Sequence, residues 1–286
     1  MNFDIALLLI QDGLTNGAIY ALLALAILLV FAVTRVLYVP QGEFVAFGAL
    51  TLATLQQAKV PGTAYLVAGI GAVTMALELI AALRERRRQG VATSAMLYLV
   101  IPMALLGLAF FGAEGWRTPS FTGFRVELGP MTASGQSLLV LAASAILIVL
   151  LWLFFGRTLW GKALRATAMN RTGARLVGIP TEASGRLAFT LAALLGGFSG
   201  VLIAPFTTIY YDSGFLIALK GFVGTVIGGM TSYPLAALGA VLVGLLEAFA
   251  SFYASALKEV IVFSLLIPVL LWRSLMSRHV EEEHDE

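Results

Sequence analysis

The stretch GRTLWGKALRATAMNRTGARLVGIP, residues 156–180, determines how the rest of the chain is interpreted. It carries five basic residues and no acidic one. Apolar runs without a formal charge lie on both sides, at Gln136–Phe155 and Leu187–Phe206, and each is long enough to cross a bilayer as a helix. A basic loop between two spans is typical of the cytoplasmic side, and its Ala, Leu, Arg and Met content predicts a short helix at the membrane surface. The loop alone does not distinguish an ordinary positive loop from a docking element for a cytoplasmic partner.

The composition indicates an integral membrane protein. Hydrophobic residues make up 59% of the 286 residues, charged residues 12%, and the mean hydropathy is +0.93, whereas a soluble domain has about 25% charged residues. The net charge of +2 does not favour a nucleic-acid partner. There is no cysteine, which excludes disulfides and thiol chemistry. The N-terminus has no basic residue before its apolar run and carries Asp4 and Asp12, so we do not expect a cleavable signal peptide.

The hydropathy pattern predicts an all-α, polytopic membrane protein with about eight or nine transmembrane helices in a single domain, residues 1–286. Six apolar segments of 20 to 22 residues are expected to span the membrane: Gly13–Thr34, Ala64–Leu83, Val91–Gly112, Gln136–Phe155, Leu187–Phe206 and Pro234–Ala254. Three more are short or interrupted: Gln41–Gln57, Leu216–Thr231 and Val260–Trp272. Broken helices are tolerated in lipid only where they face protein or a water-filled cavity, so they favour a transport pathway over a passive anchor.

The basic residues predict the topology. We place Arg35, the cluster 84–88, the loop 157–186 and the segment from Arg273 to Arg278 in the cytoplasm. This arrangement requires nine crossings, or eight if one short segment is re-entrant. It leaves the N-terminus and the loops 113–135 and 207–215 outside, and the acidic tail 277–286 in the cytoplasm.

Glycines recur one helical turn apart within the spans. The pairs Gly13/Gly17, Gly196/Gly200 and Gly224/Gly228 are each spaced as GxxxG. Small residues at this spacing let helix backbones approach closely, which favours tight helix packing or dimerisation.

No enzyme motif is found. GRTLWGKA, residues 156–163, approaches the phosphate-binding pattern GxxxxGK[ST], but Ala163 replaces the hydroxyl residue and a membrane span precedes the motif instead of a strand. If ATP drives this protein, it therefore binds elsewhere. The spans contain no histidine, and neither HExxH nor GxSxG occurs. We assign no metal to His279 or His284 and expect no cofactor and no enzymatic activity.

Polar residues inside apolar segments are the candidate functional residues. Glu247 lies mid-span, Glu78 lies near a span end, and Gln41 and Glu43 follow a break at Pro40. Ionisable groups at such depth are costly, so they favour a functional role. The alternative is structural pairing, for instance of Glu247 with Lys220, and Thr15, Asn16 and Tyr20 are candidates for hydrogen bonds between helices.

Four stretches of the sequence resemble those of a known protein family. They are GLTNGAIYALLALAILLVFAVTRVLYVPQGEFVAFGAL (13–50), GKALRATAMNRTGARLVGIP (161–180), LGGFSGVLIAP (195–205) and KGFVGTVIGGMTSYPLAALGAVLVGLLEAF (220–249). In order and spacing they resemble the permease subunits of bacterial ABC importers for branched-chain amino acids, of the LivH type. The sequence departs from the family pattern at 39–41, over 58–135 and at the C-terminus, which leaves urea, short amides and other amino acids open as substrates.

The resemblance implies an inner-membrane importer subunit that works with a second, similar permease, two cytoplasmic ATPases and an external substrate-binding protein. It implies that the loop 159–179 couples ATP hydrolysis to transport, through Gly161, Arg165, Ala166, Arg171, Arg175 and Gly178. For a zwitterionic substrate, we name as pathway residues Asn16, Tyr20, Gln41, Glu43, Lys220 and Glu247.

Two other classes of function remain open from the residues. One is an ion-coupled secondary carrier or channel for small solutes, with Glu78 and Glu247 as ion or proton sites. The other is a membrane scaffold without transport of its own, which the broken helices disfavour.

Overall fold

The computed structural model describes residues 3–38, 40–57, 118–120, 123–128, 131–230 and 232–271, with isolated positions between 59 and 73. The expected span Val91–Gly112 and nearly all of Ala64–Leu83 lie outside the described residues. So do Glu78, the basic cluster 84–88 and the acidic tail 277–286. The number of crossings is therefore still a prediction.

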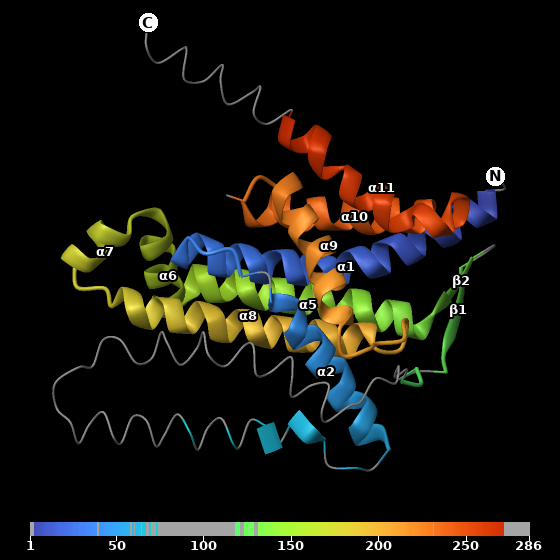
Figure 1. The fold of residues 1–286 in the computed structure, drawn as a ribbon, viewed down its shortest axis with the longest axis horizontal. Coiled ribbons are helices and arrows are strands. Elements are labelled where there is room, and N and C mark those ends of the chain that lie inside the picture. Colours follow the sequence, from blue (N-terminus) through green and yellow to red (C-terminus); the bar gives the residue numbers. More distant parts are fainter. Residues whose placement is uncertain are drawn as a thin grey trace, which may run out of the picture.

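Four long helices form the body of the fold: α1 (Phe3–Thr34), α5 (Gly135–Arg157), α8 (Thr181–Ile203) and α10 (Tyr233–Tyr253). Each is long and apolar enough to cross a membrane, and in Figure 1 they run along one another. They match four expected spans, but α1 begins ten residues earlier than expected and α8 six residues earlier. The chain is thus an all-α membrane protein, as predicted.

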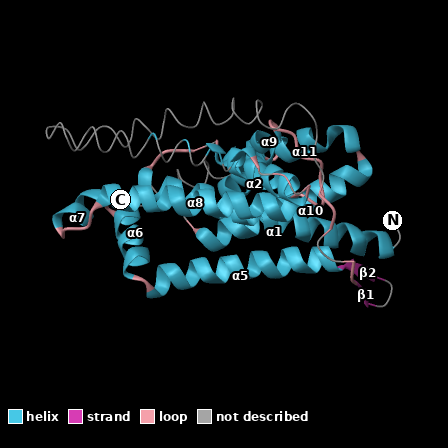
Figure 2. Cartoon of the chain, turned by 90° about the horizontal axis from the view of Figure 1, so that it is seen from below, coloured by secondary structure: helices cyan, strands magenta, loops and turns pink. Residues whose placement is uncertain are grey.

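α1 is the central helix of the described part. Its segment from Ile19 to Val30 is almost completely buried, and α10, α8, α9 and α5 all pack on it. α5 lies at the edge of the bundle and contacts chiefly α1 and α6, so much of its apolar surface stays exposed (Figure 2).

Two shorter helices, α2 (Gln41–Gln56) and α9 (Ser213–Ile227), cross the long ones steeply (Figure 1). α2 follows the end of α1 after a break of six residues and packs on α8 and α9. The 3₁₀ turn η1 (Ser255–Leu257) leads from α10 into α11 (Lys258–Ser264), which a turn at Leu265 interrupts. All three interrupted segments of the sequence are therefore short or broken helices.

The basic loop folds into two helices where one was expected. α6 (Leu159–Met169) is capped by Thr158, whose hydroxyl oxygen accepts from the Gly161 N–H at 2.9 Å. α7 (Arg171–Leu176) is capped by Asn170 in the same way. Because α5 continues through Arg157 and α8 begins at Thr181, the connection is shorter than the expected 157–186.

α6 and α7 lie at one end of the molecule, and a small hairpin lies at the other (Figure 2). The hairpin, β1 (Arg125–Leu128) and β2 (Met131–Ser134), pairs antiparallel within the expected loop 113–135, where no structure was predicted. The connection between α8 and α10, which contains α9, leads from the hairpin end of α8 to Tyr233, whose ring contacts Phe155 at the end of α5 that precedes α6.

The three glycine pairs all pack within the chain. A Cβ on Gly17 would lie 2.8 Å from the Cα of Val241 in α10, and one on Gly224 would lie 2.5 Å from the Cα of Ala240. Gly200 faces the backbone of α2 just as closely. The close approach that these spacings predict is thus made between helices of one chain, and it requires no dimer.

Candidate functional site

A cavity of about 600 Å³ lies between α1, α9, α10 and α11 and the chain that follows α8. Several of its lining residues recur three or four positions apart on α1, so they share one face of that helix. The polar and charged lining residues are Asp12, Thr15, Asn16, Tyr20, Thr207, Thr208, Ser213, Lys220, Glu247, Ser251, Lys258 and Glu259. A volume of this size suits a small solute.

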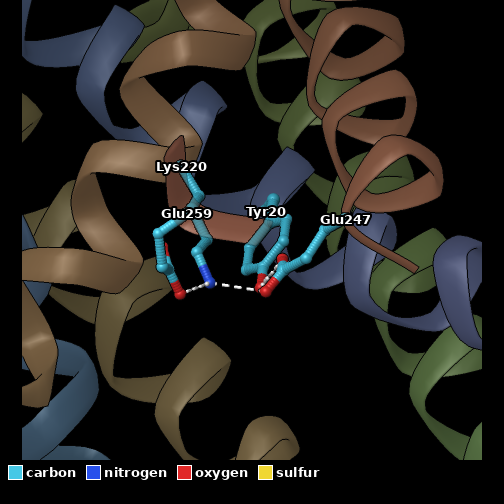
Figure 3. Close-up of polar contacts among 4 residues, drawn as sticks. All are labelled: Tyr20, Lys220, Glu247 and Glu259. Atoms are coloured by element: carbon cyan, nitrogen blue, oxygen red, sulfur yellow. Dashed lines mark hydrogen bonds and ion pairs between the residues drawn. The ribbon is translucent and has the colours of Figure 1, made fainter. Parts of the chain in front are cut away.

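One wall of the cavity carries a network of four side chains from four helices (Figure 3). The Lys220 Nζ of α9 donates to the Glu247 Oε1 of α10 at 2.6 Å and lies 3.2 Å from the Glu259 Oε1 of α11. The Tyr20 hydroxyl of α1 donates to the other oxygen of Glu247 at 2.6 Å. Both oxygens of the Glu247 carboxylate are therefore engaged.

Pairing explains why these charges can lie inside an apolar bundle. Lys220 is 6% exposed and Glu247 is 8% exposed, although each ion carries a large cost of leaving water. The short ion pair and the tyrosine hydroxyl offset that cost. The structural pairing of Glu247 with Lys220, expected as one alternative, is present.

The charges of the cavity do not balance. Three carboxylates (Asp12, Glu247, Glu259) face two ammonium groups (Lys220, Lys258). Among the described residues, neither Asp12 nor Lys258 makes an ion pair. Asp12 and Lys258 are therefore the acidic and the basic lining residue that lie outside the Lys220 network.

The structure brings four of the six expected pathway residues together and leaves two apart. Asn16, Tyr20, Lys220 and Glu247 all line the cavity. Gln41 is fully buried where α2 meets α8, and its Nε2 donates to the Ala192 carbonyl at 2.5 Å. Glu43, also on α2, does not line the cavity either.

Sequence reasoning missed Asp12, Lys258 and Glu259 as cavity residues. Lys258 and Glu259 lie between two apolar runs. A hydropathy search places charged residues in such positions outside the membrane spans, so it does not single them out. Their position directly before the interrupted segment 260–272 is the signal that could have identified them.

The expected coupling residues separate into exposed and structural ones. Arg165 and Arg171 are exposed on α6 and α7, and Arg175 is exposed while its Nε donates to the Thr181 hydroxyl at 2.9 Å. Gly161 is buried, and a Cβ there would lie 2.7 Å from the Phe155 Cα, so it positions α6 against α5. Gly178, at φ +81°, ends α7 in the left-handed conformation that favours glycine.

The same end of the molecule exposes apolar side chains that the sequence analysis did not single out. Met169, Leu176 and Val177 are 77 to 85% exposed. Together with Arg165 and Arg171 they form what we call the α6–α7 surface. Such a mixture of apolar and Arg side chains is typical of a protein contact.

Comparison with known proteins identifies the family. The family model described as "Branched-chain amino acid transport system / permease component" matches residues 9–270. The chain is 27% identical to the "High-affinity branched-chain amino acid transport system permease protein LivH" of Salmonella typhimurium, over 91% of both chains. It is 28% identical to the corresponding permease protein BraD of Pseudomonas aeruginosa, over 92% of both.

A solved structure, "PsaBC from Streptococcus pneumoniae in complex with Fab", is similar in fold, with a TM-score of 0.50 and 12% identity over 91% of this chain and 89% of that chain. The match of the family model extends across all the helices that line the cavity. The chain therefore belongs to the family of permease components of branched-chain amino acid transport systems, and it is a transport protein of the membrane and not an enzyme.

Proposed function

We propose that this chain is the membrane-spanning permease subunit of an ATP-driven importer that moves branched-chain or related small amino acids across the bacterial inner membrane. ATP is hydrolysed on separate subunits. The observation that carries the proposal is the cavity with acidic and basic side chains, set inside a bundle of apolar helices of this family. A zwitterion with an apolar side chain complements such a lining.

In this importer the chain works with a second, homologous permease, two cytoplasmic ABC ATPases and an external substrate-binding protein. The sequence supports separate ATPases, because GRTLWGKA (156–163) lacks the hydroxyl residue of a phosphate-binding loop. The α6–α7 surface supports an ATPase contact, since its arginines and exposed apolar side chains lie at the end of the molecule away from the hairpin.

The end of α1 supplies a physical link between this surface and the cavity. Arg35 stands just after α1 with φ at +60°, and its Nη2 donates to the Ala168 carbonyl of α6 at 3.0 Å. Near the middle of the same helix, Asn16 and Tyr20 line the cavity. A displacement of α6 by an ATPase therefore reaches the cavity through α1.

The basic residues at one of these two ends support a proposed orientation in the membrane. We place α6 and α7 in the cytoplasm because of their basic residues, which puts the N-terminus, the β1–β2 hairpin and the cavity toward the external face. We propose a cytoplasmic C-terminus as well, because of Arg273 and Arg278 in the sequence. A cysteine introduced at Ser120, near the hairpin, should react with an impermeant thiol reagent in intact cells, and one at Thr172 on α7 should not. Labelling in the reverse pattern would overturn this orientation.

The experiment that tests the function is purification of the tagged full-length chain in mild detergent, followed by identification of the proteins that copurify. We expect two ABC ATPases and a homologous permease. If the chain purifies alone, and if vesicles that contain it take up solute down an ion gradient, the importer proposal is wrong and the ion-coupled carrier is the better interpretation.

A further inference from the structure

Lys220 forms ion pairs with two carboxylates, and the surrounding protein fixes one of them more firmly than the other. The Glu247 carboxylate lies 2.6 Å from the ammonium, has 10% of its side chain exposed, and is fixed on its other oxygen by Tyr20. The Glu259 carboxylate lies 3.2 Å away, and 37% of its side chain is exposed. The longer and more exposed contact is the weaker one. Glu259 is therefore the partner that can exchange.

The second oxygen of Glu259 strengthens this distinction. It is buried, and it has no hydrogen-bond partner among the described residues. Glu259 stands on α11, a helix of seven residues that a turn interrupts at Leu265. Val262 holds α11 itself in the hydrophobic core, but among the described residues no second hydrogen bond fixes the Glu259 carboxylate, in contrast to that of Glu247.

Exchange of one carboxylate for another avoids the main cost of moving a buried charge. If Glu259 simply left, Lys220 would lose one of its two partners, although only 8% of its own side chain is exposed. If a solute carboxylate replaces it, the number of carboxylates on the ammonium is unchanged. The cavity of about 600 Å³ borders both residues, so a solute can reach the contact.

We propose that Lys220 is the carboxylate-binding group of this cavity and that Glu259 occupies the place of the solute carboxylate until a solute displaces it. The inference rests on the proposed function and names the solute group that the cavity selects. Urea and short amides lack a carboxylate and cannot make this exchange, so they are disfavoured. The release of Glu259 also removes the ion pair that joins α11 to α9 and so couples solute binding to the contact between these two helices.

The test is a binding measurement on the full-length chain in lipid nanodiscs, with the membrane and ATPase subunits that copurify and without any soluble substrate-binding protein. Ligand-observed NMR would compare isocaproate, which keeps the carboxylate of leucine without its ammonium, with leucinamide, which keeps the ammonium without the carboxylate. We expect isocaproate to bind and leucinamide to bind at least tenfold more weakly.

The decisive variant is Glu259→Gln, which removes the competing carboxylate and keeps the side-chain shape. We expect it to strengthen isocaproate binding about two- to fivefold, the range that an exposed ion pair contributes. Glu182→Gln, an equivalent change at an exposed site at the start of α8, should leave binding unchanged. Unchanged or weaker isocaproate binding in Glu259→Gln, or equal binding of leucinamide by the wild type, would overturn the proposal.

If Glu259→Gln does not fold, a second variant tests whether Lys220 binds the solute carboxylate. Lys220→Gln combined with Glu247→Gln removes the buried pair as a unit, and isocaproate binding should then be lost. Retained binding would show that Lys220 is not the receptor. Copurification with the ATPases is measured separately, so a failure of this inference is distinguishable from a failure of the proposed function.

Discussion

Replacement of Lys220 by Met should destabilise the protein strongly, because it leaves a buried carboxylate without its cation. Glu247 has 10% of its side chain exposed and would keep the Tyr20 hydroxyl as its remaining partner. Breaking a buried pair from one side typically costs about 3–5 kcal/mol. Since Tyr20 still satisfies one oxygen, we expect the lower end of that range. A loss of about 3 kcal/mol lowers the folding equilibrium constant by about a hundredfold.

The double variant Lys220→Met, Glu247→Gln separates pairing from packing. It removes both charges, and the glutamine carbonyl can still accept from Tyr20. The Glu259 side chain is 37% exposed, so it depends less on Lys220 than Glu247 does, and we expect stability to recover to within about 1 kcal/mol of the wild type. The free energy of unfolding would be measured by denaturant titration in bicelles. If the double variant is as unstable as the single one, the buried pair does not explain the effect.

The same pair of variants also separates structure from transport. If the pair serves only to stabilise the fold, the double variant should restore uptake together with stability. If Lys220 contacts the solute, as we propose, the double variant should be stable and inactive. Uptake by cells that contain the complete transporter measures this, normalised to the amount of protein in the membrane.

Three further predictions concern the helices that surround the cavity and the α6–α7 surface. Arg165→Glu should abolish uptake while ATP hydrolysis and membrane insertion persist, and unchanged uptake would exclude Arg165 from the ATPase contact. Gly17→Ala should lower the free energy of unfolding by about 1–3 kcal/mol, because the added Cβ would lie 2.8 Å from the Val241 Cα; Gly156→Ala, which meets open space, should not lower it. Asn170→Ala should cost about 1 kcal/mol and speed amide hydrogen exchange in α7, since it removes the N-cap, whereas Asn170→Asp should retain protection.

The long helices could be predicted from the sequence because a run of about 20 apolar residues is a strong signal. Their ends could not. The expected first span starts at Gly13, whereas α1 starts at Phe3 and includes Asp4 and Asp12, of which Asp12 lines the cavity. α8 likewise begins within a polar turn, where Glu182 is favourable near a helix N-terminus.

The cavity could be predicted only in part. Asn16, Tyr20, Lys220 and Glu247 stand out in the sequence as polar residues within apolar runs. Nothing in the local pattern separated them from Gln41, which is also buried and polar but lies between α2 and α8. That distinction depends on which helices pack together, and the cavity joins residues from Leu9 to Glu259 that no periodicity relates.

The glycines that let the helices approach have a consequence for large-scale mutagenesis. In a saturation screen scored by uptake alone, Gly17, Gly200 and Gly224 should prove as intolerant as Lys220, although none of these glycines lines the cavity. Their substitutions act on the separation between helices and not on the solute. Sensitivity to mutation will therefore map the packing of this protein as strongly as its transport pathway. A parallel score for the amount of folded protein is required before sensitive positions are assigned to solute contact.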